Sequence, residues 1–352
     1  MEALHTSEEA PQISLEHLQL LTDDVGIIQH SLYGIPRRDT GYTTDDNARA
    51  LTVVARCSKT RPGKELQLLA STYLAFLQHA QEPSGWFLNV MDYDRTWKQT
   101  KSSDQDVFGR AFWALAEAAA SRLPEPQKAA ARHMLGCATG AIPRVSSTRA
   151  IALLLIGCAA RHQFAPQESL LATITSLAEN LCDRYDAESS HGWHWFEPDL
   201  TYGNARLPHA LFAAAKLTRN TRFLRVAELT ARFLTEATFA HGVLHPIGNH
   251  GWYAREGVRA HFDQQPIDAA ASVELYLEAF EATGQPDYYH LARTAYSWYL
   301  GKNAKGAQIA SPETGACYDG LTPEGVNLNQ GAEACTTFLM ATLALASVNP
   351  PV

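Results

Sequence analysis

Two kinds of helical segment alternate along the chain. The first kind is rich in alanine and leucine and carries few charges, as in 111–120 and 210–215. The second kind has apolar residues three and four positions apart between charged residues, as in 64–81 and 220–237. A helix that is apolar all round is buried, whereas an amphipathic helix covers a core with one face. The pattern therefore predicts an inner set of helices surrounded by an outer set.

The outer set has six predicted members, several of which follow a proline or a polar capping residue. They are 14–22, 64–81, 124–138, 166–185, 220–237 and 286–303. These segments alternate with six alanine-rich ones. The sequence thus predicts an all-α protein with twelve helices arranged as six hairpins.

A short polar motif opens each predicted inner helix. It reads DDNAR at 45–49 and DVFGR at 106–110, and degenerate copies follow at 147–151, 204–208, 268–272 and 330–334. Six such units predict a closed (α/α)6 toroid, which gathers the polar openings around one cavity. We expect a single domain over residues 1–352, with residues 1–12 disordered.

Long connections rich in Trp, Tyr, Asp, Asn and Gly precede four of the inner helices, at 82–105, 186–204, 241–267 and 304–331. Strand signals are confined to short aromatic pieces such as 85–90 and 192–196, which we expect to form β-hairpins at the cavity rim. An open helical solenoid that binds another protein is the alternative fold. The connections argue against it, because long ordered connections on one face of a compact scaffold usually carry function.

Composition narrows the class of partner. The chain of 352 residues is 46% hydrophobic and 19% charged, with a net charge of −8 and no basic run to meet phosphates, so we expect no nucleic-acid partner. An acidic cavity suits a neutral substrate such as a sugar. Neither a signal sequence nor a membrane-length apolar run is present, so we expect a cytoplasmic protein. The sequence is compatible with a homo-oligomer, because hydrophobic periodicity does not distinguish an exposed apolar face from one that packs in the core.

The sequence contains no motif for a bound metal or cofactor. It lacks GxGxxG, P-loop, HExxH and GxSxG patterns, and its six cysteines and its histidines have no zinc spacing. The scattered cysteines instead indicate reduced residues of the core. We expect neither a metal ion nor a cofactor.

The carboxylates at the openings of the inner helices are the first set of candidate catalytic residues. A threonine or aspartate caps the helix at 43–47, and Asp45 and Asp46 point about 100° apart, so one can cap while the other faces the cavity. A carboxylate at a helix N-terminus favours its ionised form and suits a general base. Related positions hold Asp106 and Asp268.

Glu197 is the candidate general acid. It lies among aromatic residues in the segment 192–204, where desolvation would raise its pKa and keep it protonated near neutrality. The alternative is that Glu197 simply caps a helix or pairs with Arg206.

Aromatic and polar residues in the same connections form a candidate sugar site, because flat rings stack on sugars while polar groups bond the hydroxyls. Each ring alone is more often a packing residue, and His209 can equally be a buried core histidine. The candidate substrate-binding residues are Tyr42, Asn47, Arg49, Trp86, Asp104, Trp193, Trp195, Tyr202, Asn204, His209, His250, Asn329 and Glu333.

The repeats and three segments resemble the six-hairpin glycosidase-like superfamily over nearly the whole chain. The segments are 41–49, 195–197 together with 202–209, and 329–333. They look like those of bacterial proteins in that superfamily that are often associated with glycosyltransferases. The resemblance implies an (α/α)6 barrel with sugar chemistry at the inner-helix N-termini, and it suggests a mannose-containing oligosaccharide. It leaves the reaction open among hydrolases, lyases, phosphorylases and epimerases.

Our leading hypothesis is a glycoside hydrolase that inverts the anomeric centre. Glu197 would protonate the leaving oxygen, and one of Asp45, Asp46, Asp106 and Asp268 would activate water. The alternatives are a sugar epimerase or isomerase that uses His209, His245 and His250, or a sugar-binding barrel without turnover.

Overall fold

The structure is a computed structural model that describes residues 13–98 and 104–351, so the expected disorder of residues 1–12 lies outside the described residues. Twelve α-helices occur within these ranges. They are α1 (Glu16–Leu21), α2 (Thr44–Cys57), α3 (Lys64–Ala80), α4 (Gln105–Ala119), α5 (Glu125–Thr139), α6 (Thr148–Phe164), α7 (Glu168–Glu188), α8 (Arg206–Thr218), α9 (Thr221–Thr238), α10 (Pro266–Thr283), α11 (Pro286–Ser297) and α12 (Ala332–Ser347).

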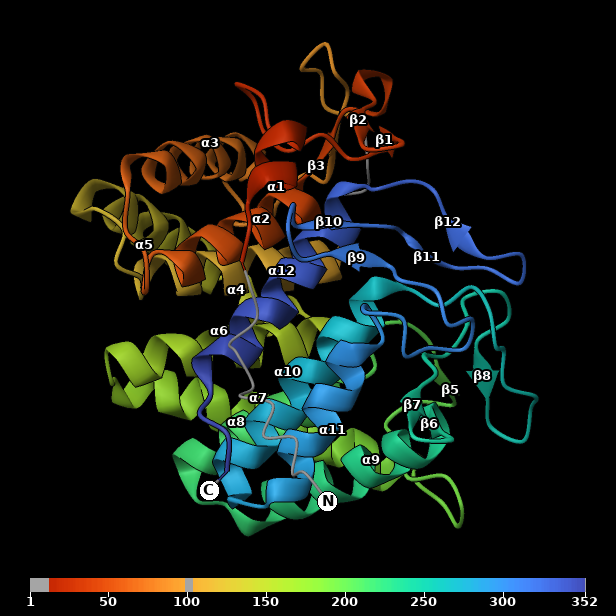
Figure 1. Ribbon diagram of the computed structural model, residues 1–352. Helices are drawn as coiled ribbons and strands as arrows, with labels where there is room; N and C mark the ends of the chain where they lie inside the picture. The colour runs from red at the N-terminus through yellow and green to blue at the C-terminus, as the bar shows by residue number, and fades with distance from the viewer. Residues whose placement is uncertain (1–12, 99–103, 352) are drawn as a thin grey trace.

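The even-numbered helices form a closed inner ring. Helices α2, α4, α6, α8, α10 and α12 each pack against the next, and α12 packs against α2 to complete the circle. The odd-numbered helices lie outside it, with α3 on α2, α5 on α4 and the others on their own neighbours (Figure 1). The predicted (α/α)6 barrel and its twelve helices are therefore confirmed.

The alternation of helix types explains this arrangement. In α4, every residue from 107 to 119 is buried, as expected for an inner helix, whereas α9 buries one stripe that includes Phe223, Val226 and Ala227. Close packing within the ring depends on small side chains. A Cβ at Gly157 of α6 would lie 2.9 Å from the Trp113 Cα of α4, so only glycine permits this approach.

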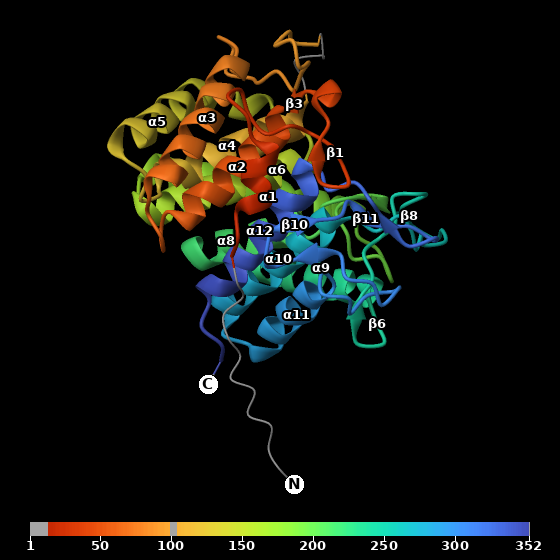
Figure 2. The same ribbon diagram turned by 45° about the horizontal axis from the view of Figure 1, so that its top comes forward.

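Strands within the described ranges form six short antiparallel pairs. These are β1 (Ser31–Leu32) with β2 (Ile35–Pro36), β3 (Tyr42–Thr43) with β4 (Val90–Met91), β5 (Asp199–Leu200) with β8 (Tyr253–Ala254), β6 (Phe239–Ala240) with β7 (Val243–Leu244), β9 (Ala310–Ser311) with β10 (Ala316–Cys317), and β11 (Gly320–Leu321) with β12 (Val326–Asn327). Most of them gather at one side of the molecule (Figures 1 and 2).

The expected aromatic strand pieces are only partly correct. In 85–90, only Val90 belongs to a strand, and 192–196 forms turns with a single bridge between Ser190 and Trp193. Local aromatic content signals burial as well as strand, and here burial dominates, since Trp193 and Trp195 are buried. The last outer helix also ends at Ser297 instead of 303, where the chain turns through Gly301 with a φ of 96°.

All six cysteines lie in the described part of the chain and are free, and five of them are buried while Cys137 is exposed. No helix in the described ranges has the length and apolar character that crossing a membrane requires. Two 3-10 turns, Arg38–Thr40 and Ile142–Arg144, complete the regular structure.

Candidate functional site

A cavity of about 360 Å³ lies at the N-terminal ends of α2, α10 and α12. The connections before α2, α4, α10 and α12 complete its wall, as expected for loops that share one face of the ring. Its lining is rich in carboxylate and amide side chains: Gln29, His30, Thr43, Asp45, Asp46, Arg49, Asn89, Asn249, Asp263, Gln265, Asp319, Thr322, Asn327 and Glu333.

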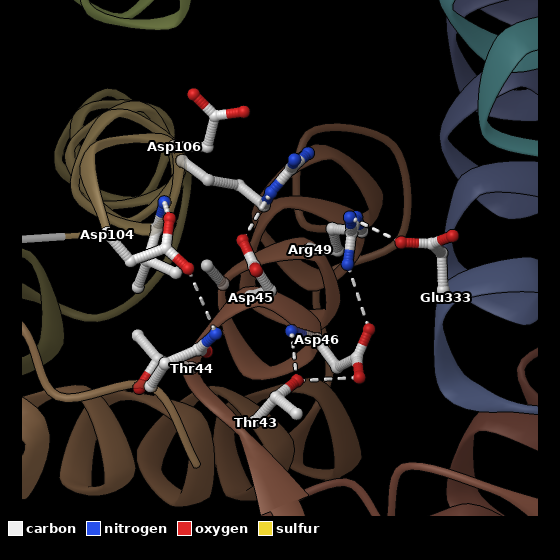
Figure 3. A network of polar contacts seen from close by, with 12 residues as sticks. Thr43, Thr44, Asp45, Asp46, Arg49, Asp104, Asp106 and Glu333 are labelled. Carbon is white, nitrogen blue, oxygen red and sulfur yellow. Dashed lines mark hydrogen bonds and ion pairs between the residues drawn. The ribbon is translucent and has the colours of Figure 1, made fainter. Parts of the chain in front are cut away.

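Thr43 caps α2 and so leaves both neighbouring carboxylates available. Its hydroxyl accepts a 3.1 Å hydrogen bond from the Asp46 backbone N–H. Asp45 and Asp46 diverge as their helical spacing predicts. Asp46 lies toward Arg49 (Figure 3), whereas Asp45 accepts a hydrogen bond from Arg110. Of the threonine and the aspartates expected as the cap, Thr43 takes this role, so neither Asp45 nor Asp46 is needed to meet the free N–H group.

Asp46 is a buried carboxyl held on both oxygens. The Thr43 hydroxyl donates to Oδ2 at 2.6 Å, and Arg49 Nη1 donates to Oδ1 at 2.9 Å. Burial raises the pKa of Asp46 to about 6, although the Arg49 guanidinium opposes the rise. Asp46 therefore titrates close to neutral pH, at a fixed place beside the cavity.

Glu333 extends from α12 toward α2 and joins the ion pair between Asp46 and Arg49. Arg49 Nη2 donates to its Oε2 at 2.7 Å, and 42% of its side chain stays exposed to the cavity. Its negative charge contributes to the raised pKa of Asp46, Asp268 and Asp319. A carboxylate that influences residues of α2, of α10 and of the connection 304–331 is well placed to act on a bound molecule.

Asp319 is a cavity residue that the sequence analysis missed. It accepts hydrogen bonds from the Gly331 backbone N–H at 3.1 Å and from the Asn329 side chain, while burial raises its pKa to about 7. The connection 304–331 was expected to carry function, but no motif separates Asp319 from Glu313 or Glu324 in it. The hydrogen bond from Gly331, at the N-terminus of α12, to Asp319 forms only in the folded chain and leaves no signal in the sequence.

A second polar cluster lies between α4, α6 and the loop before α8. Asp106 accepts from the Ser147 hydroxyl at 2.9 Å, from Arg149 at 3.2 Å and from the Tyr202 hydroxyl at 2.5 Å. Burial works against ionisation, but Arg149, Tyr202 and Arg110 together lower the pKa of Asp106. Asp106 and Tyr202 are thus brought together, although neither is among the lining residues of the cavity.

Asp268 opens α10 with one oxygen unpaired. The Gly203 backbone N–H donates to Oδ1 at 2.7 Å, whereas the buried Oδ2 has no hydrogen-bond partner among the described residues. Burial raises the pKa of Asp268 to about 7. A buried oxygen of this kind needs a proton or an external donor.

Several predicted binding residues instead hold the scaffold together. Asn47 is fully buried and bonds the Ile27 N–H and the Thr43 carbonyl, and Asn204 bonds both backbone groups of Thr201. Tyr42 is also buried and donates to the Asp23 carboxylate at 2.7 Å. Asp104 caps α4.

The aromatic segment around Glu197 packs away from the cavity. Trp193 and Trp195 both contact the Phe233 ring and are buried, and Glu197 is absent from the described lining residues. Trp86 is half-buried against Phe108. A fully buried ring such as Trp195 offers no face to a sugar. Trp86 and Trp193 are likewise absent from the described lining residues of the cavity.

The histidines singled out from the sequence do not converge. His209 lines a separate cavity of about 280 Å³ among the C-terminal ends of the inner helices, where burial lowers its pKa to about 3. His250 is exposed and His245 half-buried, and neither is among the described lining residues of the first cavity, where His30 is found. Asn329 links His30 to Asp319.

No protein-family model and no curated protein sequence matches the chain. A D-mannose isomerase matches in structure with a TM-score of 0.73 and 14% identity, covering 94% of this chain and 95% of that one. A sugar epimerase from a ruminal bacterium follows, with a TM-score of 0.71, 12% identity and coverage of 94% and 95%.

A GH76 α-1,6-mannanase from a Salegentibacter species has a TM-score of 0.62 and 13% identity, covering 94% of this chain and 96% of that one. Identities this low show a shared fold alone. That fold is the (α/α)6 barrel of several carbohydrate-active enzymes, some of which isomerise sugars and some of which hydrolyse glycosidic bonds.

Proposed function

We propose that this protein is a glycoside hydrolase that cleaves an oligosaccharide in the cavity at the inner-helix N-termini. The observation that carries the proposal is that one cavity holds carboxyl groups whose surroundings favour different protonation states. Asp319 is protonatable near neutral pH, whereas Glu333 is paired with Arg49. Groups whose environments differ in this way divide into proton donor and proton acceptor.

Asp319 takes the role of general acid in this proposal. Its pKa of about 7 leaves it largely protonated at pH 6, and it lines the cavity. The Gly331 N–H and the Asn329 side chain hold the carboxyl in one orientation, which proton transfer to a leaving oxygen requires. Glu197, the acid expected from the sequence, has no comparable contact with the cavity.

Glu333 takes the role of general base. Arg49 binds one of its oxygens, and the exposed part of the side chain leaves the carboxylate accessible to water in the cavity. Asp45 lines the same wall with 23% of its side chain exposed and can accept hydrogen bonds from sugar hydroxyls. Inversion requires the acid and base to be about 6.5–9.5 Å apart, and retention about 5–5.5 Å.

The substrate class follows from the same lining. Carboxylate and amide groups dominate it, which favours a neutral, hydroxyl-rich ligand over an anionic one. Mannose-containing oligosaccharides, the glycosyltransferase-associated branch, a single-domain chain and a cytoplasmic location rest on the sequence and stay predictions.

A sugar epimerase or isomerase is the second candidate function. It is supported by the D-mannose isomerase and the sugar epimerase, which match this chain with higher TM-scores than the mannanase does. Proton transfer beside a carbonyl would then use His30 and Asp319 in place of the three histidines expected from the sequence.

The deciding experiment is product analysis by NMR on purified protein incubated with manno- and gluco-oligosaccharides. A new reducing end supports hydrolysis, and its first anomer separates inversion from retention. A changed sugar without chain cleavage would replace the proposal by the second candidate. Ligand binding without any product would indicate a sugar-binding barrel.

Matched variants tie the reaction to the site. Asp319→Asn and Glu333→Gln should each lower kcat by about 10²–10⁴-fold, the usual contribution of a general acid or base. Glu313→Gln, in the same connection as Asp319 but exposed, should leave kcat unchanged. Full activity of both cavity variants would refute the assignment.

A further inference from the structure

A groove of about 470 Å³ continues the cavity outward. It lies between the β1–β2 hairpin and the segment 327–329, and it shares His30, Asp319 and Asn327 with the cavity. Because Asp319 belongs to both spaces, a chain bound at that carboxyl can extend directly into the groove.

The hairpin that forms one wall is firmly attached to the opposite wall. The Ser31 backbone N–H donates to Asn329 Oδ1 at 2.8 Å, and the Gln330 N–H donates to the Ser31 hydroxyl at 2.9 Å. Gly34 packs so closely on Gln330 that a Cβ there would lie 2.7 Å from its Oε1. The groove is therefore a preformed feature of the fold, which lowers the cost of ordering a ligand.

The groove combines apolar and polar surface. Tyr33, at the turn of the hairpin, is 68% exposed, and Leu32 and Leu328 are 59% and 50% exposed. Arg37 and His30 also line it, and the Arg37 charge lowers the pKa of His30 further below the level set by burial. An exposed aromatic ring beside hydrogen-bonding groups suits a sugar, whose ring faces are apolar and whose edges carry hydroxyls.

We propose that this groove is an outer sugar-binding subsite in which the Tyr33 ring stacks on a pyranose unit. The ligand is a neutral oligosaccharide that runs from the cavity past Asp319 to Tyr33. This inference rests on the proposed function and deepens it, because it makes chain length a determinant of affinity. Continuity with the cavity favours a sugar chain over a second protein copy on the exposed apolar residues.

The test is calorimetric titration with α-1,6-linked manno-oligosaccharides of one to five units, carried out in a Glu333→Gln background to slow turnover. Affinity should rise about tenfold once the oligosaccharide is long enough to reach Tyr33. This factor corresponds to the binding free energy of one aromatic contact. Tyr33→Ala should remove that gain and leave the shortest ligands unaffected, whereas Tyr33→Phe should retain it. Phe164→Ala, which removes another exposed ring (59% exposed) from the end of α6, is the control.

Equal affinity along the series, an unchanged gain in Tyr33→Ala, or no binding by any member would overturn the inference. If Tyr33→Ala has a lower molar mass than wild type in light scattering but the same gain of affinity with ligand length, the hairpin is instead a contact between copies of the protein. Cleavage by wild-type protein without a chain-length effect would refute only the subsite. A Tyr33-dependent gain without cleavage by wild-type protein would refute only the hydrolase.

Discussion

Arg110 Nε donates a 2.6 Å hydrogen bond to Asp45 Oδ1, so the arginine of the second repeat unit holds a carboxylate of the first. The relationship recurs around the ring. Arg149 of the third unit pairs with Asp106 of the second at 3.2 Å, and Arg49 of the first pairs with Glu333 of the sixth at 2.7 Å. The repeated arginine of the sequence motif is therefore a connection between adjacent hairpins.

The Arg110–Asp45 pair should be energetically coupled. Because the two side chains are only 8% and 23% exposed, solvent screens their attraction less than at the surface. A double-mutant cycle with Arg110→Gln and Asp45→Asn, followed by urea unfolding, should give a coupling free energy of about 1–3 kcal/mol. The exposed pair Arg222–Asp186 is the control and should give less than about 1 kcal/mol.

Replacement of Asp319 should change the pH dependence of the reaction as well as its rate. A general acid acts in its protonated form, so wild-type activity should fall as pH rises above about 7, the pKa of Asp319. Asp319→Asn should lose this basic limb together with most of the activity, as measured from kcat against pH. Glu324→Gln, an exposed change in the same connection, should keep the wild-type profile, and a basic limb that survives in Asp319→Asn would assign it to another group.

Glu197→Gln distinguishes the acid expected from the sequence from the acid proposed from the structure. Since Glu197 lies outside the described lining of the cavity, the variant should keep kcat within about twofold of wild type. Initial-rate measurements on the same oligosaccharide used for Asp319→Asn test this. A loss of 100-fold or more would return the acid role to Glu197.

Asp268 should make the protein less stable as pH rises. Its pKa is about 7 in the folded state and ordinarily 3.8, so the folded state binds more protons between these values. The stability from this group is present below pH 3.8 and is lost as pH rises through about 7. Asn mimics the protonated form, so the Tm of Asp268→Asn relative to wild type should increase by a few degrees from pH 4.5 to pH 8, measured by scanning calorimetry. A difference that is constant or falls with pH would contradict this.

Glu274 pairs with two arginines inside the ring, the buried Arg206 and the partly exposed Arg56, which also pairs with Glu117. Its side chain is 4% exposed and lies 2.5 Å from Arg56 and 2.6 Å from Arg206. Burial alone would raise its pKa, but these two guanidinium groups lower it to about 2. Glu274→Gln should reduce the free energy of unfolding by about 3–5 kcal/mol in urea titrations, because it leaves the buried guanidinium of Arg206 without its carboxylate partner.

Glu281→Gln provides the comparison for Glu274. Glu281 is 47% exposed and pairs with Lys216, so its replacement should cost less than about 1 kcal/mol. Equal losses in the two variants would show that the network around Glu274 contributes no more than a surface pair.

The fold was predictable because its signals are periodic. Alanine-rich and amphipathic helices alternate six times, and each polar motif marks one inner N-terminus, so the ring and the face that holds the cavity follow from the sequence. The predictions of the α11 boundary and of the strand segments were less accurate. The end of α11 depends on the turn at Gly301, and the strands depend on which aromatic residues are buried in the core.

The candidate site was only partly predictable, for reasons that particular residues make clear. Asp45, Asp46, Arg49 and Glu333 lie in repeated motifs and line the cavity. Asp319 does not, because an irregular connection positions it through contacts with Asn329 and Gly331. Sequence context also does not separate a ring exposed to a ligand, such as Tyr33, from a buried one, such as Trp195.

The ion pair between Arg49 of α2 and Glu333 of α12, which joins the first and last inner helices, has a consequence for the folding kinetics. Arg49 and Glu333 are 284 positions apart, so the cavity wall forms only after a loop of nearly the whole chain has closed. Helices form from local contacts and on a much faster timescale. During refolding, far-ultraviolet circular dichroism should therefore recover before sugar binding does, and the ability to bind a ligand reports completion of the barrel.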